Sequence, residues 1–507
     1  MSCPYATLVT VAILALLGAC KEEEPAPSKP QRLTIEELQN PETCESCHPT
    51  HYREWKASMH AYASDDPVFV AMNALGQEET NGEMSNFCVN CHAPMAVRAG
   101  LTDGGVVSED TPEHLKGVTC YFCHNVESVD GDSNGQVTLA GDDIMRGNLR
   151  DPAPVEPSAH GIGASPFTDP RNPESARFCG GCHDIVNHND VHLERTFAEY
   201  NESVFSKTGS LSFITCSGCH MPFRDGLAAV ETGTGETVPM RVNQIHSHLW
   251  PGVDVAMTSW PDADKYEAAV TCALDQSIDF KEDLSGMGAS GGPLYVIEIQ
   301  AGHKMPSGAS QDRRLWVEII AYDAEDNVVC SSGAVPDDVA VASFQDLSFD
   351  CGWTNAGPGG PRFPLYRDQI FDADGNETHM FWRAAPSDQS DSGVISRALP
   401  AATLVMRDGT VVPHTEQIEF SGLPDNAVRA TVRLKMRPMD HDVLDELVDA
   451  GLLNASIHDE VRTITIASAS VDYYRESGWE ARPTPERSTD CYAAFFCAFD
   501  ADAPNCD

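Results

Sequence analysis

Short runs of β-branched and aromatic residues dominate the second half of the chain and predict strands. Leu294–Gln300, Leu315–Tyr322 and Val328–Ala334 come first, and an Asp-Ala-Glu-Asp-Asn turn between the last two predicts a hairpin. The further candidates are strands Thr403–Met406, Gln417–Phe420, Ala427–Met436 and Thr463–Val471, with a helix at His441–Leu452. We therefore expect residues 293–475 to form an all-β, sandwich-like domain.

The first half of the chain lacks such runs and predicts short helices joined by long irregular loops. Helix candidates are Thr34–Leu38, His51–His60 and Leu193–Glu202. A Gly- and Ser-rich stretch at residues 280–292 is typical of a linker. The predicted fold is multidomain, with a mostly α-helical and irregular domain at 34–279, the linker, the β domain, and a Cys- and Pro-containing tail at 476–507.

The first 20 residues resemble a lipoprotein signal peptide. An apolar run from Ala6 to Ala19 ends at the lipobox-like Leu17-Gly18-Ala19-Cys20, so Cys20 is the predicted lipidation site. The run is too short for a transmembrane helix, which needs about 20 residues. A plain secretory signal is the alternative, because no Lys or Arg precedes the run. Both readings predict export.

Residues 21–33 are charged and Pro-rich and predict a flexible tether. In a Gram-negative host, Lys21 replaces the Asp that is typical of inner-membrane retention. We therefore expect a lipid-anchored protein at the outer membrane, on its periplasmic side or at the cell surface.

Acidic residues outnumber basic ones by 77 to 33, which gives a formal net charge of −44. This charge argues against nucleic acid and anionic lipid as partners. It favours basic redox proteins or cationic mediators, with an association that weakens as salt rises. Solubility in a saline habitat is the alternative explanation of the same charge.

Five copies of the motif Cys-x-x-Cys-His occur between residues 44 and 220. They are Cys44-Glu-Ser-Cys47-His48, Cys88-Val-Asn-Cys91-His92, Cys120-Tyr-Phe-Cys123-His124, Cys179-Gly-Gly-Cys182-His183 and Cys216-Ser-Gly-Cys219-His220. In this motif both thiols form thioethers with one heme, and the histidine is the proximal ligand of its iron. Zinc knuckles, redox dithiols and disulfides are alternatives, but a histidine adjoins every pair here. The motifs predict five covalent heme c groups in a multiheme cytochrome c domain.

Six further cysteines are expected to form disulfides in an exported chain. They are Cys272, Cys330, Cys351, Cys491, Cys497 and Cys506. Cys330 with Cys351 is the favoured pair, because both fall in the same β region. Among the others, we expect pairs that attach the tail to the body, and the exact pairing stays open.

The surroundings of the five motifs resemble multiheme cytochromes related to hydroxylamine oxidoreductase and its tetraheme electron-acceptor protein. The resemblance covers roughly residues 40–325 and rests on Trp55-Lys-Ala-Ser58-Met-His60, the residues around each motif, and Gly302-His303-Lys-Met-Pro306-Ser-Gly308. No motif has Lys in place of His, and no tyrosine matches the heme-crosslinking residue of hydroxylamine oxidoreductase. The resemblance therefore does not carry catalysis with it, and no catalytic residue is predicted.

The resemblance also implies which histidines bind the far, distal face of each iron. In such cytochromes a histidine remote from the motif closes that face, which points to His60, His160, His246, His248 and His303. His246 and His248 flank one residue, so their rings point opposite ways in an extended segment and suit two hemes. His114 and His51 are reserve candidates. Surface roles fit His379, His414, His441 and His458 better.

Two histidine ligands on an iron favour electron transfer, whereas an open face permits chemistry. We expect a pentaheme electron carrier that works between periplasmic or cell-surface redox partners. The alternative is an oxidoreductase that acts on a small nitrogen or sulfur compound at one open heme. In a third hypothesis the β domain docks a partner or the cell surface, and the hemes serve it.

One loop suggests calcium. Asp130-Gly-Asp132-Ser-Asn134-Gly135 matches the first half of a calcium-binding loop, with oxygen-bearing residues at alternate positions. Gly141 stands where such a loop has its bidentate Glu, so a plain polar turn is the alternative.

Overall fold

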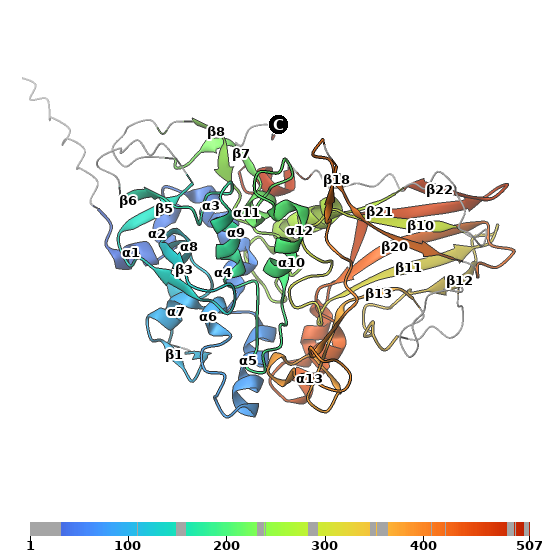
Figure 1. Ribbon diagram of the computed structural model, residues 1–507, viewed down its shortest axis with the longest axis horizontal. Helices are drawn as coiled ribbons and strands as arrows, with labels where there is room; N and C mark the ends of the chain where they lie inside the picture. Colours follow the sequence, from blue (N-terminus) through green and yellow to red (C-terminus); the bar gives the residue numbers. More distant parts are fainter. Residues whose placement is uncertain are drawn as a thin grey trace, which may run out of the picture.

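The computed structural model describes most of the chain after the predicted tether. The described residues are 32–108, 110–148, 159–230, 238, 240–281, 293–344, 351, 363–406, 408–420, 422–483, 491, 493–500 and 506. The predicted signal peptide, Cys20, residues 21–31 and residues 282–292 of the predicted linker lie outside them. Within the described part, no helix is long and apolar enough to cross a membrane. Figure 1 shows a helix-rich region in blue to green beside a region of long strands in yellow to red.

The helix-rich region consists of short helices and small two-stranded sheets. Its helices are α1 (Ile35–Gln39), α2 (Glu42–Glu45), α3 (Pro49–Ala57), α4 (Met59–Tyr62), α5 (Pro67–Glu79), α6 (Val89–His92), α7 (Pro94–Arg98), α8 (Cys120–His124), α9 (Pro173–Gly180), α10 (Thr196–Glu202), α11 (Cys216–His220) and α12 (Ala263–Ser277). Its strand pairs are β1 (Thr102–Asp103) with β2 (Val106–Val107), β3 (Val126–Val129) with β4 (Val137–Leu139), β5 (Ile144–Gly147) with β6 (Gly161–Ala164), and β7 (Phe223–Leu227) with β8 (Met240–His246).

Local capping signals define two of these helices. The Thr34 side chain accepts a hydrogen bond from the Glu37 backbone, and the Glu37 carboxylate accepts one from the Thr34 backbone N–H at 2.8 Å, which forms a capping box at the start of α1. Asp66 is the N-cap of helix α5, and its carboxylate accepts a hydrogen bond from Val68 N–H at 2.9 Å. Pro67 lies in the first turn of the helix. The sequence-based helix at Thr34–Leu38 matches α1, whereas α5 has no counterpart in the sequence-based prediction.

Two sheets make up most of the strand-rich region. The elements are β9 (Ile278–Phe280), β10 (Leu294–Ile299), β11 (Arg314–Tyr322), β12 (Val328–Ser332), β13 (Leu365–Tyr366), β14 (Asp368–Phe371), β15 (Glu377–Thr378), β16 (Val394–Ser396), β17 (Leu404–Val405), β18 (Val411–Val412), β19 (His414–Glu419), β20 (Arg429–Arg437), α13 (His441–Asp449), β21 (Ile464–Arg475) and β22 (Trp479–Pro483). The larger sheet has the order β12-β11-β20-β21-β22 with β13 beside β11, and the smaller has the order β19-β10-β9. The predicted hairpin is present, because β11 pairs antiparallel with β12.

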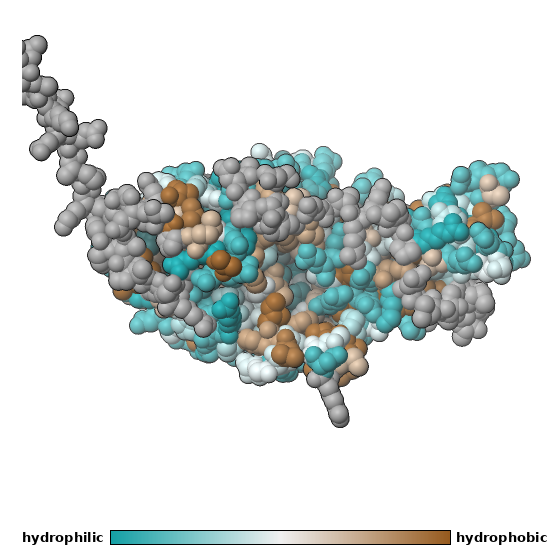
Figure 2. All heavy atoms as spheres, turned by 90° about the horizontal axis from the view of Figure 1, so that it is seen from above, coloured by the Kyte–Doolittle hydropathy of each residue, from teal (hydrophilic) through white to brown (hydrophobic). Residues whose placement is uncertain are grey.

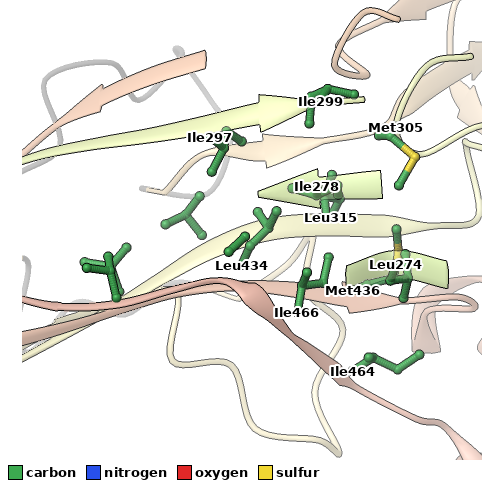
Figure 3. Close-up of a cluster of buried hydrophobic side chains, with 14 of the residues drawn as sticks. Leu274, Ile278, Ile297, Ile299, Met305, Leu315, Leu434, Met436, Ile464 and Ile466 are labelled. Carbon is green, nitrogen blue, oxygen red and sulfur yellow. The ribbon is translucent and has the colours of Figure 1, made fainter. Parts of the chain in front are cut away.

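The two sheets enclose one apolar core. Ile297 and Ile299 from the smaller sheet meet Leu315, Leu434 and Ile466 from the larger one, and all five are fully buried (Figure 3). Across the sheets, the Tyr295 hydroxyl donates to the Ala469 carbonyl at 2.7 Å. Alternate residues of β20 point into this core, as period-2 burial requires. The region is thus sandwich-like, in line with the multidomain expectation.

Helix α12 packs on this core, although it falls within the predicted heme domain. Tyr266, Val270 and Leu274 are buried in the same cluster as the strands, and β9, which follows α12, pairs with β10. The physical reason is the apolar face of α12, which needs a partner surface and finds it at the end of the sandwich. The domain boundaries themselves stay a prediction.

Three disulfides connect the six remaining cysteines of the described part. Cys330 pairs with Cys351, which was the favoured pair. Cys272 in α12 pairs with Cys491, and Cys497 pairs with Cys506 in the tail. The first of these two pairs attaches the tail to the body, as expected, whereas the second closes a short loop within the tail.

Candidate heme-binding sites

Each Cys-x-x-Cys-His motif folds as a single helical turn. In three motifs the histidine N–H donates to the carbonyl of the first cysteine, with His48 on Cys44 at 2.8 Å, His92 on Cys88 at 3.2 Å and His183 on Cys179 at 2.9 Å. This turn puts both thiols and the imidazole near one another, as a covalently attached heme requires. We number the sites 1 to 5 in the order of their motifs.

The proximal imidazoles are oriented by backbone carbonyls. Nδ1 of four of them lies at hydrogen-bonding distance from a carbonyl oxygen, namely His48 with Ala228 (2.6 Å), His92 with Ala63 (2.9 Å), His124 with Arg146 (2.8 Å) and His220 with Pro251 (2.8 Å). A carbonyl only accepts, so Nδ1 carries the proton and donates it. This leaves the Nε2 lone pair for a metal, the usual outer-shell arrangement of a ligating histidine.

Four proximal rings each face a second histidine ring from elsewhere in the chain. The pairs are His48–His160 (6.3 Å between ring centres), His124–His248 (6.2 Å), His183–His60 (6.2 Å) and His220–His303 (6.2 Å). A metal–imidazole bond is about 2 Å long, so two imidazoles on opposite faces of one metal have ring centres about 6 Å apart. The residues present thus fit a six-coordinate heme iron at sites 1, 3, 4 and 5. The structure brings four of the five predicted distal histidines to a proximal partner.

His246 is the predicted distal ligand that the structure places elsewhere. Its Nδ1 lies 2.8 Å from the Met221 carbonyl, and its ring contacts Phe223. It lines a polar pocket with Asp169, Arg171 and Asn243 and faces no proximal ring. The expectation that His246 and His248 serve two hemes disagrees with this geometry, because β8 ends at His246 and only the chain beyond it, at His248, turns into the heme region.

Site 2 differs from the other four. Among the described residues, the close ring contact of His92 is with Phe69 of α5, with ring centres 3.9 Å apart and planes within 5°. No second imidazole faces His92 in the described ring contacts. Sequence reasoning missed Phe69, because an aromatic residue inside an apolar helical run resembles ordinary core.

The reserve histidines occupy different environments. His51 is half-buried between sites 1 and 3, with its ring 6.0 Å from that of His48 and 4.7 Å from that of His248. His114 lies on a short helical turn at the edge of the region and has no ring partner among the described contacts. His51 therefore packs between ligand rings, one helical turn after His48.

Thiols of different motifs are close enough to shift one another's pKa. Cys44 meets Cys120, Cys91 meets Cys182, and Cys179 meets Cys216. The Trp250 ring also contacts both His60 and His248, at 4.8 and 5.2 Å between ring centres. Sites 1, 3, 4 and 5 are therefore adjacent in that order, and site 2 adjoins site 4.

Burial keeps the ligand imidazoles neutral. It lowers the pKa of His60 and His248 to about 3 and that of His48 and His183 to about 4. A neutral imidazole is the form that binds a metal, so these sites need no deprotonation near neutral pH.

A buried carboxyl supports the distal ligand of site 3. Glu54 of α3 accepts a hydrogen bond from the His248 backbone N–H at 2.7 Å, and burial raises the pKa of Glu54 to about 8. This contact fixes the backbone that carries His248. Sequence reasoning missed Glu54, because nothing in the sequence pairs it with a residue 194 positions away.

The calcium-like loop does not gather its oxygens. The Asp130 carboxylate accepts from Ser128 and Thr138, Asp132 pairs with Arg177 at 2.9 Å, and Asn134 bonds the backbone of Val186. The loop is the turn between β3 and β4, which is the polar-turn alternative. Within the described residues, no cluster of three or more His, Cys, Asp or Glu residues suits a metal ion.

Comparisons with known proteins agree with this geometry. Residues 43–125 match the family of cytochrome c554 and c-prime. The fold is similar to the crystal structure of a penta-heme cytochrome c552 from Thermochromatium tepidum, with a TM-score of 0.51 and 18% identity over 84% of this chain and 97% of that chain. No curated protein matches the chain in sequence.

The five motifs, with these similarities, are typical of a multiheme c-type cytochrome with covalently bound heme c. The family match covers the first three motifs, and the likeness to the penta-heme cytochrome is one of fold. The relation to hydroxylamine oxidoreductase stays a prediction.

Proposed function

We propose that the chain is a pentaheme electron-transfer protein, lipid-anchored at Cys20, that relays electrons between redox partners. The observation that carries the proposal is the set of four facing histidine pairs, each with ring centres 6.2 or 6.3 Å apart. Heme c bound at the five motifs would supply reversible one-electron transfer. Two imidazoles at a site leave no coordination position for a substrate, which suits a carrier.

The protein's part in this function is to hold the ligands still. Backbone carbonyls fix Nδ1 of the distal rings as well, with His160 bonded to Gly161, His248 to His246 and His303 to Lys304 at 2.9 to 3.0 Å. Main-chain partners of this kind restrict ring rotation and bias each ring toward one tautomer. Rigid ligands reduce the rearrangement that accompanies each change of oxidation state.

The adjacency of the sites supports a continuous route. It runs from site 1 through sites 3 and 4 to site 5, with Trp250 packed between the distal ligands of sites 3 and 4. Cys219 of site 5 is the exposed member among the ten motif cysteines, whereas the others are partly buried. Site 5 is therefore the end that we expect to meet a redox partner.

The net charge of −44 supports a basic partner or a cationic mediator. We place the protein at the outer membrane, because of Cys20 and Lys21. Mass spectrometry of the isolated protein tests the anchor, which predicts a diacylglyceryl group on Cys20 and its loss in Cys20→Ala.

Two histidines that are two residues apart provide a matched test of the heme sites. Pyridine hemochrome should give about five hemes per chain, in line with the motif count. His248→Gly should add one carbon monoxide-binding, high-spin heme, because it removes the ring facing His124. His246→Gly should leave the spectrum unchanged. Unmodified motif thiols, or equal spectra of the two variants, would refute the assignment.

We propose as a second candidate an oxidoreductase that acts on a small nitrogen or sulfur compound at site 2. The observation that favours it is the ring of Phe69 on His92, together with the lack of a facing imidazole among the described contacts. Two half-buried carboxyls occur in this part of the fold. Burial raises the pKa of Asp66, at the start of α5, to about 6, and that of Glu194 to about 7. Such groups can exchange protons near neutral pH.

Binding and turnover measurements test this candidate. The reduced wild-type protein should bind one carbon monoxide per chain, and dye-reduced protein should consume hydroxylamine, nitrite or sulfite. Asp66→Asn should lower turnover about tenfold or more, as expected for loss of a proton donor. Glu54→Gln, a change at a buried carboxyl beside a histidine-paired site, should not. Absence of carbon monoxide binding would eliminate the candidate and leave the carrier function.

A further inference from the structure

The hairpin of β7 and β8 has an apolar outer face. Its members, which we call the hairpin patch, are Phe223, Leu227, Met240 and Val242, and they are between 39% and 63% exposed. Leu227 and Met240 are direct cross-strand partners. The hairpin lies at the top of the helix-rich region in Figure 1, and Figure 2, which looks down on that side, shows apolar atoms gathered there in brown. Exposed apolar clusters of this kind mark interaction sites.

The side chains of the hairpin patch cannot pack inward, because the opposite face of the hairpin already packs against the body of the protein. Arg224 is buried and donates to the Asp500 carboxylate at 2.8 Å, and Ile245, its partner on β8, is buried as well. The Asn243 N–H donates to the Asp225 carboxylate at 2.7 Å, which joins the two strands at a bulge. The outward side chains are therefore held in place facing solvent.

The hairpin is also less acidic than the chain as a whole. Residues 223–246 contain two basic residues, Arg224 and Arg241, and three acidic residues, Asp225, Glu231 and Glu236, which gives a net charge of −1. The whole chain has a net charge of −44. The hairpin therefore adds only one net negative charge to the face that would meet a lipid bilayer.

The hairpin is fixed to the part of the fold that follows the predicted tether. Val230 N–H donates to the Cys47 carbonyl at 2.8 Å, and His48 Nδ1 bonds Ala228 at 2.6 Å. Cys20 precedes Arg32, the first described residue, by 12 positions. Twelve extended residues span at most about 40 Å. A bilayer that holds Cys20 is therefore within reach of the hairpin.

We propose that the hairpin patch rests on a lipid bilayer and sets the orientation of the tethered protein on the membrane surface. The proposal rests on the proposed anchoring at Cys20. A tether raises the effective concentration of the bilayer at the hairpin patch. A patch that binds too weakly to hold a free protein on the membrane therefore still orients a protein that is anchored there. Its aliphatic side chains and single Phe suit an acyl boundary, whereas protein interfaces favour Trp, Tyr and Arg at their centres.

An artificial tether tests the patch without depending on natural lipidation. The mature, heme-loaded chain would carry a histidine tag in place of residues 1–20 and would be bound to aligned phosphatidylcholine bilayers that contain nickel-chelating lipid. Linear dichroism of the heme Soret band then reports the orientation of the protein. We expect clear dichroism for the wild type and a loss of at least half of it in the double variant Met240→Asp, Val242→Asp.

A second exposed apolar hairpin supplies the matched control. Leu404 and Met406, at and beside β17, are 65% and 58% exposed, so Leu404→Asp with Met406→Asp adds the same charge elsewhere. This variant should keep the wild-type dichroism, and both variants should keep the heme spectrum. Equal dichroism in the two variants, or none in the wild type, would overturn the proposal.

Two further outcomes are distinguishable. A stable dimer in solution that Met240→Asp, Val242→Asp abolishes would make the patch a protein interface and would overturn the proposal. An unmodified Cys20 would refute the natural anchor and with it the physiological setting, even if the tagged protein still showed dichroism. Dichroism therefore tests the patch, and mass spectrometry tests the anchor.

Discussion

The strand-rich and helix-rich regions are held together in different ways. Between the two sheets, Ile297, Leu315 and Leu434 are fully buried in one large apolar cluster. The helix-rich region has smaller apolar clusters, such as the one that joins Leu38 of α1 to Tyr121 and Phe122 of α8. Its interior is lined by motif thiols and paired imidazoles instead. One region contains its own core, whereas the other is built to be completed by a cofactor.

The largest expected effect comes from withholding heme. In a chain produced without heme attachment, the helix-rich region should be unfolded and the sandwich folded. Neutral imidazoles and thiols alone do not form a stable hydrophobic core. Circular dichroism and limited proteolysis would show a protease-resistant fragment that begins near α12. Cooperative folding of the whole heme-free chain would contradict the comparison.

A cavity in the sandwich should destabilise only the strand-rich region. Leu434→Ala removes a fully buried side chain from β20 and should cost about 2–5 kcal/mol in the free energy of unfolding. Denaturant unfolding followed by fluorescence should shift, while the Soret band of the folded protein stays unchanged. Val428→Ala, at a partly exposed position in the same region, should change the free energy by less than about 0.5 kcal/mol.

The two regions should respond to pH in opposite directions. In the strand-rich region, His379 lies 3.4 Å from Asp312 and 3.6 Å from Asp442. Burial opposes its protonation, but the two nearby carboxylates outweigh burial and raise the pKa of His379 to about 9. This contribution is fully present below about pH 6.5 and is lost as pH rises through 9, and it amounts to about 3 kcal/mol. Denaturant unfolding between pH 6 and 10 should show the loss, and His379→Gln should remove it.

In the helix-rich region the ligand histidines have lowered pKa values, so the unfolded chain binds more protons than the folded one. The stability of that region is therefore present above about pH 6.5 and falls in acid. Acid titration followed at the Soret band measures this loss. If the strand-rich region unfolded before the helix-rich region in acid, the expected difference between the two regions would be wrong.

The smallest effect concerns a helix cap. Thr34→Ala removes the capping box of α1 and should cost about 1 kcal/mol or less. Hydrogen exchange at α1 should accelerate, whereas the midpoint of heme-monitored unfolding should hardly move. A large shift in that midpoint would mean that local helix propensity, rather than ligation, limits the stability of this region.

Local signals in the sequence predicted the parts of the fold that depend on neighbours along the chain. The turn Asp323–Asn327 led to the hairpin of β11 and β12, and Thr34 with Glu37 marked α1. The five motifs carry both covalent and proximal ligands within five residues, so no tertiary information was needed to find them. Strand bounds agreed within a few residues where apolar runs were long.

The far faces of the sites depend on tertiary placement, which spacing cannot supply. His246 and His248 looked equivalent in the sequence, yet only His248 continues past the end of β8 to face His124. Phe69 and Glu54 act across long sequence separations and gave no local signal. The packing of α12 on the sandwich was missed for the same reason, since its apolar face did not reveal which surface it would cover.

The disulfide between Cys272 and Cys491 closes a covalent ring that includes almost the whole strand-rich region. The two cysteines are 219 positions apart, and all five heme motifs lie before the ring. A chain exported from its N-terminus presents every motif to the attachment machinery before Cys491 arrives, so the ring closes on a region that needs no cofactor. A single protease cut within the ring leaves both pieces joined. The sandwich can thus be nicked without separating from the hemes.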